Sequence, residues 1–204
     1  VYDYAWVPEE STWTTWMETS AEYVHDAKMD FAELVIPTKD SVRNTFLLKS
    51  LLTNGYHALN VGSTGTGKTI NINKYLQKEM DPRRYVPLCL GFSAQTSANQ
   101  TQDIIDGKLE KRKKGVYGPT AGFHFIIYVD DLNMPQRELY FAQPPVELLR
   151  QCISQNGWYD RKTLTFRRII DWTFVAAMGP PGGGRNPISA RIKRWLNIVG
   201  YVEM

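Results

Sequence analysis

The chain has 204 residues, of which 43% are hydrophobic and 22% are charged, a composition typical of a globular domain with one main core. No apolar run approaches the roughly 18 residues of a membrane span, and the start lacks the basic and apolar regions of a signal peptide, so we expect an intracellular protein with no membrane partner. The net charge of +3 is too small to indicate nucleic acid as a partner.

Residues 1–36 are rich in aromatic and acidic side chains without a sustained period, and we predict a leader that packs on a neighbouring surface. A short strand is expected over 34–36, and residues 37–204 are predicted to form one α/β domain. The chain begins without an initiator Met and ends at Met204 directly after an apolar segment. We therefore expect it to be part of a longer protein.

A phosphate-binding pattern follows the apolar strand predicted over 56–61. A helix that starts at Thr38 or Asp40 and stops at Gly55 precedes the strand, and another helix is predicted over 70–80. The pattern is a complete Walker A loop, made of Gly62, Ser63, Thr64, Gly65, Thr66, Gly67, Lys68 and Thr69. The alternative is a chance glycine-rich turn, but a strand before the loop and a helix after it favour the phosphate site.

Each residue type in this loop has a role in binding a nucleoside triphosphate. Glycines let successive backbone N–H groups curl around the β- and γ-phosphates, Lys68 supplies a positive charge, and the Thr69 hydroxyl ligates Mg²⁺. The following helix would place the phosphates at its N-terminus, where free N–H groups and the macrodipole favour anions. The sequence therefore predicts that ATP or ADP, with Mg, is the cofactor.

After the Walker helix, a strand is predicted over 85–92 and a capped helix over 98–111. The basic run 111–114 is expected to be the solvated end of that helix, although contact with a phosphate or an acidic surface is the alternative. Cys89 and Cys152 lie in apolar surroundings, so we expect buried reduced thiols rather than a disulfide or a metal site.

A second acidic element turns the nucleotide site into a candidate hydrolase site. Residues 123–129 form an apolar, β-branched and aromatic run that ends in Asp130 and Asp131, a Walker B pattern. Asp130 would hold Mg²⁺ through its water shell, and Asp131 stands where a carboxylate polarises the attacking water. Alone, such a pattern is often only a strand that meets a turn, but its place after a full Walker A loop makes it specific.

The last part of the chain continues the alternation of strands and helices. The predicted elements are a helix over 144–155, a hairpin over 158–170, a strand over 172–178, a helix over 189–195 and a strand over 197–202. Glycines and prolines make 179–187 a shaped loop at the carboxyl edge of the sheet, where ligands bind in open α/β sheets. We therefore predict a doubly wound α/β fold with a five-stranded parallel sheet between helices.

Several longer sequence segments resemble those of a known family. They cover 92–101, 130–135, 142–150 and 179–187, in addition to the Walker A loop. Together they resemble the third AAA+ module of a dynein heavy chain, nearer the axonemal than the cytoplasmic type, over essentially the whole chain. The resemblance implies the P-loop AAA+ large subdomain with inserted β-hairpins, and a small helical subdomain that follows Met204.

The resemblance also implies a function. It predicts an ATP-binding module in a six-module motor ATPase ring that moves along microtubules, with a regulatory nucleotide site in the third module. Its partners would be the adjacent modules, the microtubule through the full motor, and dynein intermediate and light chains, in the cytoplasm, cytoskeleton and cilium axoneme. Three alternatives remain open: a nucleotide-dependent structural module without meaningful hydrolysis, another AAA+ P-loop ATPase, and a small P-loop kinase.

Two positions depart from a fully active AAA+ site, and one more matches it. Asp131 stands where Glu is usual, and Gly179 stands where a polar sensor residue is usual, which argues against rapid turnover. The resemblance makes Arg191, ahead of Arg194, the arginine that reaches in trans into the neighbouring module's nucleotide. The alternative is that both arginines are surface charges on a short helix.

Overall fold

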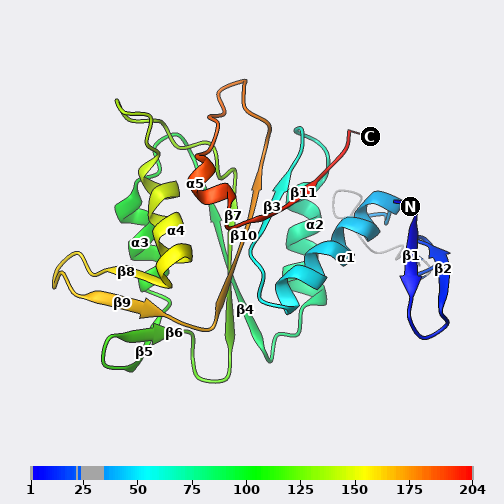
Figure 1. Cartoon of the computed structure of the whole chain (residues 1–204), viewed down its shortest axis with the longest axis horizontal. Coiled ribbons are helices and arrows are strands. Elements are labelled where there is room, and N and C mark those ends of the chain that lie inside the picture. The colour runs from blue at the N-terminus through cyan, green and yellow to red at the C-terminus, as the bar shows by residue number, and fades with distance from the viewer. Residues whose placement is uncertain (1, 22, 24–34, 204) are drawn as a thin grey trace, which may run out of the picture.

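A computed structural model describes residues 2–21, 23 and 35–203. The chain forms three groups of strands together with helices that flank the largest sheet (Figure 1). The helices are α1 (Lys39–Thr53), α2 (Lys68–Lys74), which continues as a π-helical turn η2 (Tyr75–Glu79), α3 (Ala98–Asp106), α4 (Pro144–Gln155) and α5 (Ala190–Lys193). Within the described ranges, no helix combines the length and the apolar character that crossing a membrane needs.

The main sheet has five parallel strands, as the sequence predicted. Its strands are β3 (Ala58–Val61), β4 (Tyr85–Gly91), β7 (His124–Asp130), β10 (Trp172–Met178) and β11 (Asn197–Gly200). They lie in the order β11-β3-β10-β7-β4, and every neighbouring pair is parallel. This arrangement is the P-loop AAA+ type of α/β sheet that was expected, with β10 at its centre between β3 and β7.

Helices cover both faces of this sheet because the central strands are apolar on both sides. Figure 1 shows α3, α4 and α5 on one side of the sheet and α1 and α2 on the other. Alternate residues of β7 divide between two cores: Phe125, Ile127 and Val129 pack with α3, α4 and α5, whereas Ile126 and Tyr128 pack with α1 and α2. This alternation, with a period of two residues, buries both faces of β7. Asp130 is the last residue of the strand, at the carboxyl edge of the sheet.

A second, mixed sheet is inserted between the main elements. It contains β5 (Glu110–Lys113), β6 (Val116–Gly118), β9 (Phe166–Ile169) and β8 (Gly157–Tyr159), in that order. The β8–β9 hairpin was expected, but the prediction that 98–111 is one helix ending in a solvated basic run is wrong. The helix ends at Asp106, and residues 111–113 of the basic run lie in β5, which pairs with β6, with Lys114 in the turn between them. Distant contacts such as Arg112 with Asp171 (3.2 Å) favour the strand, and no local pattern shows them.

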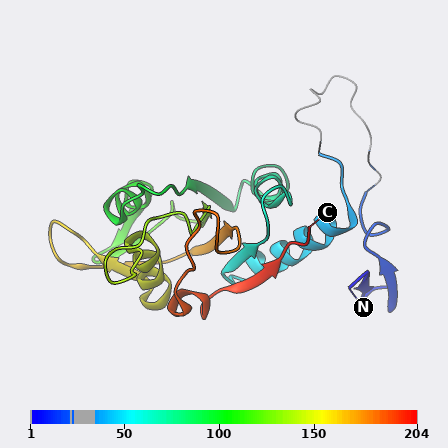
Figure 2. The same ribbon diagram turned by 90° about the horizontal axis from the view of Figure 1, so that it is seen from above.

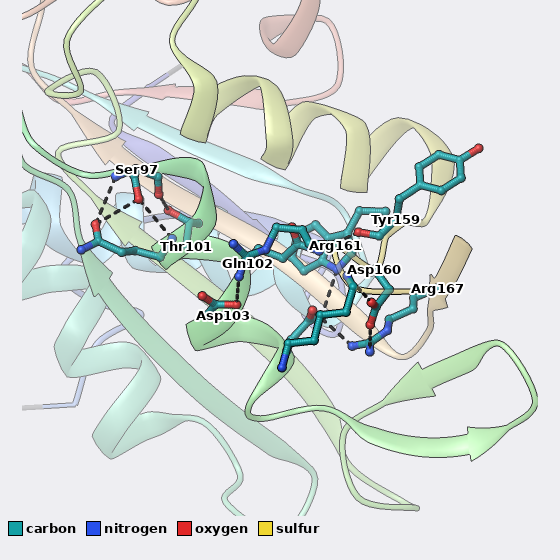
Figure 3. Close-up of polar contacts among 12 residues, drawn as sticks. Ser97, Thr101, Gln102, Asp103, Tyr159, Asp160, Arg161 and Arg167 are labelled. Atoms are coloured by element: carbon teal, nitrogen blue, oxygen red, sulfur yellow. Dashed lines mark hydrogen bonds and ion pairs between the residues drawn. The ribbon is translucent and has the colours of Figure 1, made fainter. Parts of the chain in front are cut away.

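Polar side chains join the inserted hairpin to α3 (Figure 3). The Gln102 side-chain amide donates to the Tyr159 carbonyl over 2.8 Å, and Arg167 pairs with both Asp160 and Asp106. The fully buried Trp158 ring donates its N–H to Asp106 over 3.0 Å. Burial raises the pKa of Asp106, while its partners Trp158 and Arg167 oppose that shift. The hairpin is thereby fixed to the layer of helices that carries α3 and α4.

The N-terminal segment contains structure that the sequence pattern did not indicate. An antiparallel hairpin, β1 (Tyr4–Val7) and β2 (Thr12–Thr15), lies at one end of the molecule beside the start of α1 (Figure 2). The Trp16 ring packs at a tilt against Phe46 of α1, with ring centroids 5.3 Å apart. The strand expected over 34–36 is absent at the two described residues, 35 and 36, and residue 34 lies outside the described ranges.

The two cysteines are free, but only one is buried as expected. Cys152 lies in the core on α4, and burial raises the pKa of its thiol. Cys89 is exposed, so that part of the prediction is wrong. Its strand β4 is the edge of the sheet, and Cys89 pairs in register with Tyr128, on the face that α1 and α2 cover. A strand at the edge has a neighbouring strand on one side alone, which leaves Cys89 exposed.

Candidate functional site

The candidate site lies at the carboxyl edge of the main sheet, where three central strands end beside one another. Val61 of β3 is paired with Met178 of β10, and the Gly62 N–H donates to the Met178 carbonyl over 3.3 Å. On the other side, the Leu132 N–H donates to the Ala177 carbonyl over 3.0 Å, just beyond the end of β7. These contacts bring together the Walker A loop, the two acids after β7 and the loop after β10.

The Walker A loop has the backbone that phosphate binding requires. Gly65 and Gly67 have φ of +86° and +74°, values that side-chain-bearing residues rarely adopt. The Lys68 ammonium folds back over the loop and donates to the carbonyls of Gly62 (2.8 Å) and Ser63 (2.6 Å). Burial, followed by the nearby Arg185 charge, lowers the pKa of Lys68. The loop therefore presents a cation within a curled backbone at the start of α2.

Two oxygen ligands lie together beside this cation. The Thr69 hydroxyl donates to Asp130 Oδ2 over 2.8 Å, which joins the loop to the end of β7. Among the described residues there is no cluster of three or more His, Cys, Asp or Glu that could hold a metal alone. A hydroxyl and a carboxylate suit Mg²⁺, which takes one or two protein oxygens and completes its shell with water and phosphate. The residues present therefore fit a Mg·nucleotide.

Asp131 occupies an unusual backbone conformation next to these ligands. Its φ is +52°, in the left-handed region, and its N–H donates to Asp130 Oδ1 over 3.0 Å. Such conformations cost energy in side-chain-bearing residues and cluster at functional sites. The turn places the Asp131 carboxylate at the edge of the site, 3.7 Å from the Arg185 guanidinium.

Residues at the end of the chain also belong to this site, although sequence reasoning did not select them. Tyr201 lies against Gly62 so closely that an added Cβ would be 2.7 Å from the Tyr201 Cβ. Its hydroxyl accepts a hydrogen bond from Asn71 of α2 (3.0 Å), and the Ser63 hydroxyl donates to Glu203 (2.8 Å). No motif marks these positions, because their role depends on β11 lying beside β3.

The loop after β10 supplies a further residue that was not selected, Arg185. Asn133 fastens the start of this loop by donating from its side chain to the Gly179 carbonyl over 2.9 Å. The glycine-rich composition identified a shaped loop, but nothing in the pattern indicated that its arginine points back toward Asp131.

Arg191 lies apart from these groups. It is on α5, its side chain is 67% exposed, and its guanidinium is 3.3 Å from Glu147 on α4. Figure 1 shows α5 beside α4, across the sheet from α2, which follows the Walker A loop. The structure thus brings together Lys68, Thr69, Asp130 and Asp131, and it leaves Arg191 on another surface.

Comparison with protein families agrees with this geometry. A family model described as "P-loop containing dynein motor region" matches residues 23–204. The chain belongs to this dynein motor family. The P-loop named in the description is the feature that Gly62, Lys68 and Thr69 form in the structure.

Dynein heavy chains of the axonemal type are among the similar curated proteins. The chain is 49% identical to mouse dynein axonemal heavy chain 1 over 197 residues, and 47% identical to human dynein axonemal heavy chain 3 over 202 residues. It is 42% identical to mouse dynein axonemal heavy chain 12 over 200 residues. These matches cover 96%, 98% and 97% of this chain, but only 5%, 5% and 6% of the relatives. The chain therefore spans about one twentieth of a dynein heavy chain.

Proposed function

We propose that this chain is the large subdomain of the third AAA+ module of an axonemal dynein heavy chain, and that it binds ATP or ADP with Mg²⁺. The observation that carries the nucleotide site is the conjunction of Lys68, folded over the Walker A loop, with the Thr69–Asp130 pair. The phrases at 130–135, 142–150 and 179–187 support the third module, and the similarity to axonemal heavy chains supports the type.

Each residue of the site has a proposed role. The backbone of residues 62–69 cradles the phosphates, Lys68 neutralises them, and Thr69 and Asp130 hold Mg²⁺ directly and through water. Bound Mg²⁺ would neutralise charge on the phosphate oxygens. Asp131 is the candidate for positioning the attacking water, and it does so from a side chain one methylene shorter than Glu.

We place this module in a regulatory role in the motor ring. The short Asp131 side chain and the absence of a side chain at Gly179 both favour slow turnover, whereas the phosphate and Mg²⁺ groups are complete. The state of the bound nucleotide would then change how this module packs on its neighbours. The rival function, a structural module that holds nucleotide without meaningful hydrolysis, is favoured by the same two positions.

The environment of the site follows from the proposed identity. The adjacent modules of the same heavy chain are the direct partners, and the microtubule, the intermediate chains and the light chains are reached through the assembled motor. The cellular location would be the cytoplasm and the cytoskeleton of the cilium axoneme, in keeping with the axonemal relatives.

Turnover in the assembled motor distinguishes the regulatory site from the structural one. In a full heavy chain in which only this module keeps its Walker A lysine, we expect slow but measurable phosphate release, which Lys68→Ala abolishes. Phosphate release that is unaffected by Lys68→Ala would assign the chain to the structural class. Microtubule-stimulated ATPase of the otherwise intact motor, measured with and without Lys68→Ala, tests the regulatory role separately.

A further inference from the structure

A tight turn in the loop after β10 aims Arg185 at the candidate site. The N–H groups of Gly182 and Arg185 donate to each other's carbonyls, each over 3.0 Å. Gly182, Gly183 and Gly184 have φ of +120°, +58° and +86°, so the turn requires residues without a side chain. The loop therefore reverses within three residues and returns Arg185 toward the sheet edge from which it started.

The Arg185 side chain occupies space that Gly179 leaves. A Cβ at position 179 would lie 2.7 Å from both Cδ and Nε of Arg185, closer than real Cβ contacts come. Gly179 directly follows β10, whose last residue Met178 is paired with Val61 before the Walker A loop. The stem of Arg185 thus crosses the end of the central strand, beside the phosphate loop.

Within the described residues, the N–H donors of the Arg185 guanidinium do not all have well-formed hydrogen bonds. Among the described residues it has an ion pair with Asp131, whose carboxylate oxygen is 3.7 Å away, too far for a well-formed hydrogen bond. Within the part of the chain that the structure describes, the buried Nε has no hydrogen-bond partner. A guanidinium carries five donors in a planar fork that matches a phosphate group. Arg185 is therefore a cation with free donors that is held beside a phosphate loop.

The neighbours of Arg185 indicate which phosphate it faces. The Walker A backbone would hold the phosphates from the α2 side, and Thr69 and Asp130 would hold Mg²⁺, which would neutralise phosphate charge there. Asp131 lies beyond that pair and next to Arg185. The groups at that end of the site would meet the terminal phosphate.

We propose that Arg185 binds the terminal phosphate of ATP and makes this site discriminate ATP from ADP, and that Gly179 is required because it leaves room for the Arg185 side chain. The proposal rests on the proposed nucleotide site. It assigns the recognition of the third phosphate to a residue of this chain, distinct from Arg191, which lies against Glu147.

The test measures nucleotide affinity of the 204-residue chain by calorimetry, with Mg·ADP and with the Mg complex of a non-hydrolysable ATP analogue. Arg185→Gln should weaken the analogue on the order of tenfold, the loss of a charge-assisted contact, and change ADP affinity less than twofold. Gly179→Ala should give the same selective loss while keeping the arginine, because the added Cβ displaces it. Arg83→Gln is the control and should change neither affinity. Arg83 is exposed and lies just before the start of β4, at the edge of the sheet away from the candidate site.

One further variant separates direct contact from charge balance. Because Arg185 pairs with Asp131, its removal leaves a carboxylate near the phosphates, so Arg185→Gln is also measured together with Asp131→Asn. Direct contact predicts that the double variant still binds the ATP analogue weakly, and recovery of wild-type affinity would overturn the proposal. Equal losses for ADP and the analogue, or no loss for either, would also overturn it. If the wild-type chain binds neither nucleotide, the proposed nucleotide site fails, and this assignment fails with it.

Discussion

The Thr69 hydroxyl donates a hydrogen bond to Asp130 Oδ2 over 2.8 Å, across 61 positions of sequence. This contact joins the start of the Walker helix to the end of β7, and it brings two hard oxygen atoms to one point. Oxygen ligands of this kind suit Mg²⁺. The pairing is a consequence of the parallel sheet, because β3 and β7 both end beside β10.

Removal of this hydroxyl should therefore affect the metal-dependent part of nucleotide binding. We expect Thr69→Ala to reduce the gain in ATP affinity that Mg²⁺ provides, on the order of tenfold, whereas Thr69→Ser retains it because the hydroxyl remains. Titrations with Mg²⁺ and with EDTA measure this gain. An unchanged ratio between the two conditions in Thr69→Ala would argue against a metal role for Thr69.

Hydrolysis by the chain alone is expected to be negligible. The Asp131 carboxylate is short for positioning water, and a trans arginine from a neighbouring module cannot contribute when the chain is tested by itself. Asp131→Asn should therefore change phosphate release little. A coupled phosphate-release assay measures both proteins, and turnover at or above about 1 s⁻¹, within the usual enzyme range, would refute this expectation.

Arg191 should act on the neighbouring module's nucleotide rather than on the one held by Lys68. Its guanidinium is largely exposed and lies against Glu147, on a surface separate from the Walker A loop. In a full heavy chain, Arg191→Ala is expected to leave affinity at this site unchanged and to alter nucleotide release next door. Lys193→Ala, which removes another exposed basic side chain of α5, serves as the control. Loss of binding at the Lys68 site in Arg191→Ala would contradict the trans assignment.

A histidine at the opposite end of the central strands should make stability depend on pH. Burial lowers the pKa of His57 from 6.5 to about 4, and its Nδ1 accepts the Phe174 N–H over 3.0 Å, which requires the neutral ring. Between these values the unfolded chain binds more protons, so the free energy of unfolding falls as the pH falls.

His57→Gln removes this titration and keeps a hydrogen-bond acceptor. Between pH 7 and pH 5, the wild type should lose about 2 kcal/mol more of its unfolding free energy than the variant does. Urea unfolding at the two pH values measures the difference. His124, whose pKa burial also lowers, is present in both proteins, so the difference reports the His57 titration together with its electrostatic coupling to His124. Equal losses in the two proteins would show that His57 does not titrate as described.

Local patterns were sufficient for several helices and strands of the main α/β unit. The helix over 144–155 and the strand over 172–178 have the expected bounds, because their apolar periods and the prolines at 144 and 145 are short-range signals. The Walker residues could be identified for the same reason, since their spacing along the chain determines their geometry.

Residues whose position depends on distant contacts could not be identified in this way. The basic run in β5 pairs with β6, and the edge position that exposes Cys89 follows from the order of strands in the sheet. Tyr201 lies on Gly62 because β11 is the neighbour of β3, and Arg185 returns to Asp131 because of three successive glycine dihedrals. Such relationships depend on the tertiary fold, which a local window does not contain.

The central claim is that residues 62–69 bind the phosphates of a Mg·nucleotide, and calorimetry of Lys68→Ala tests it most directly. The account predicts that the wild-type 204-residue chain binds Mg·ATP or Mg·ADP weakly, that Lys68→Ala removes most of this binding, and that Lys78→Ala, an exposed lysine on the same helical segment, leaves it unchanged. Equal affinity of the wild type and Lys68→Ala for both nucleotides would contradict the account.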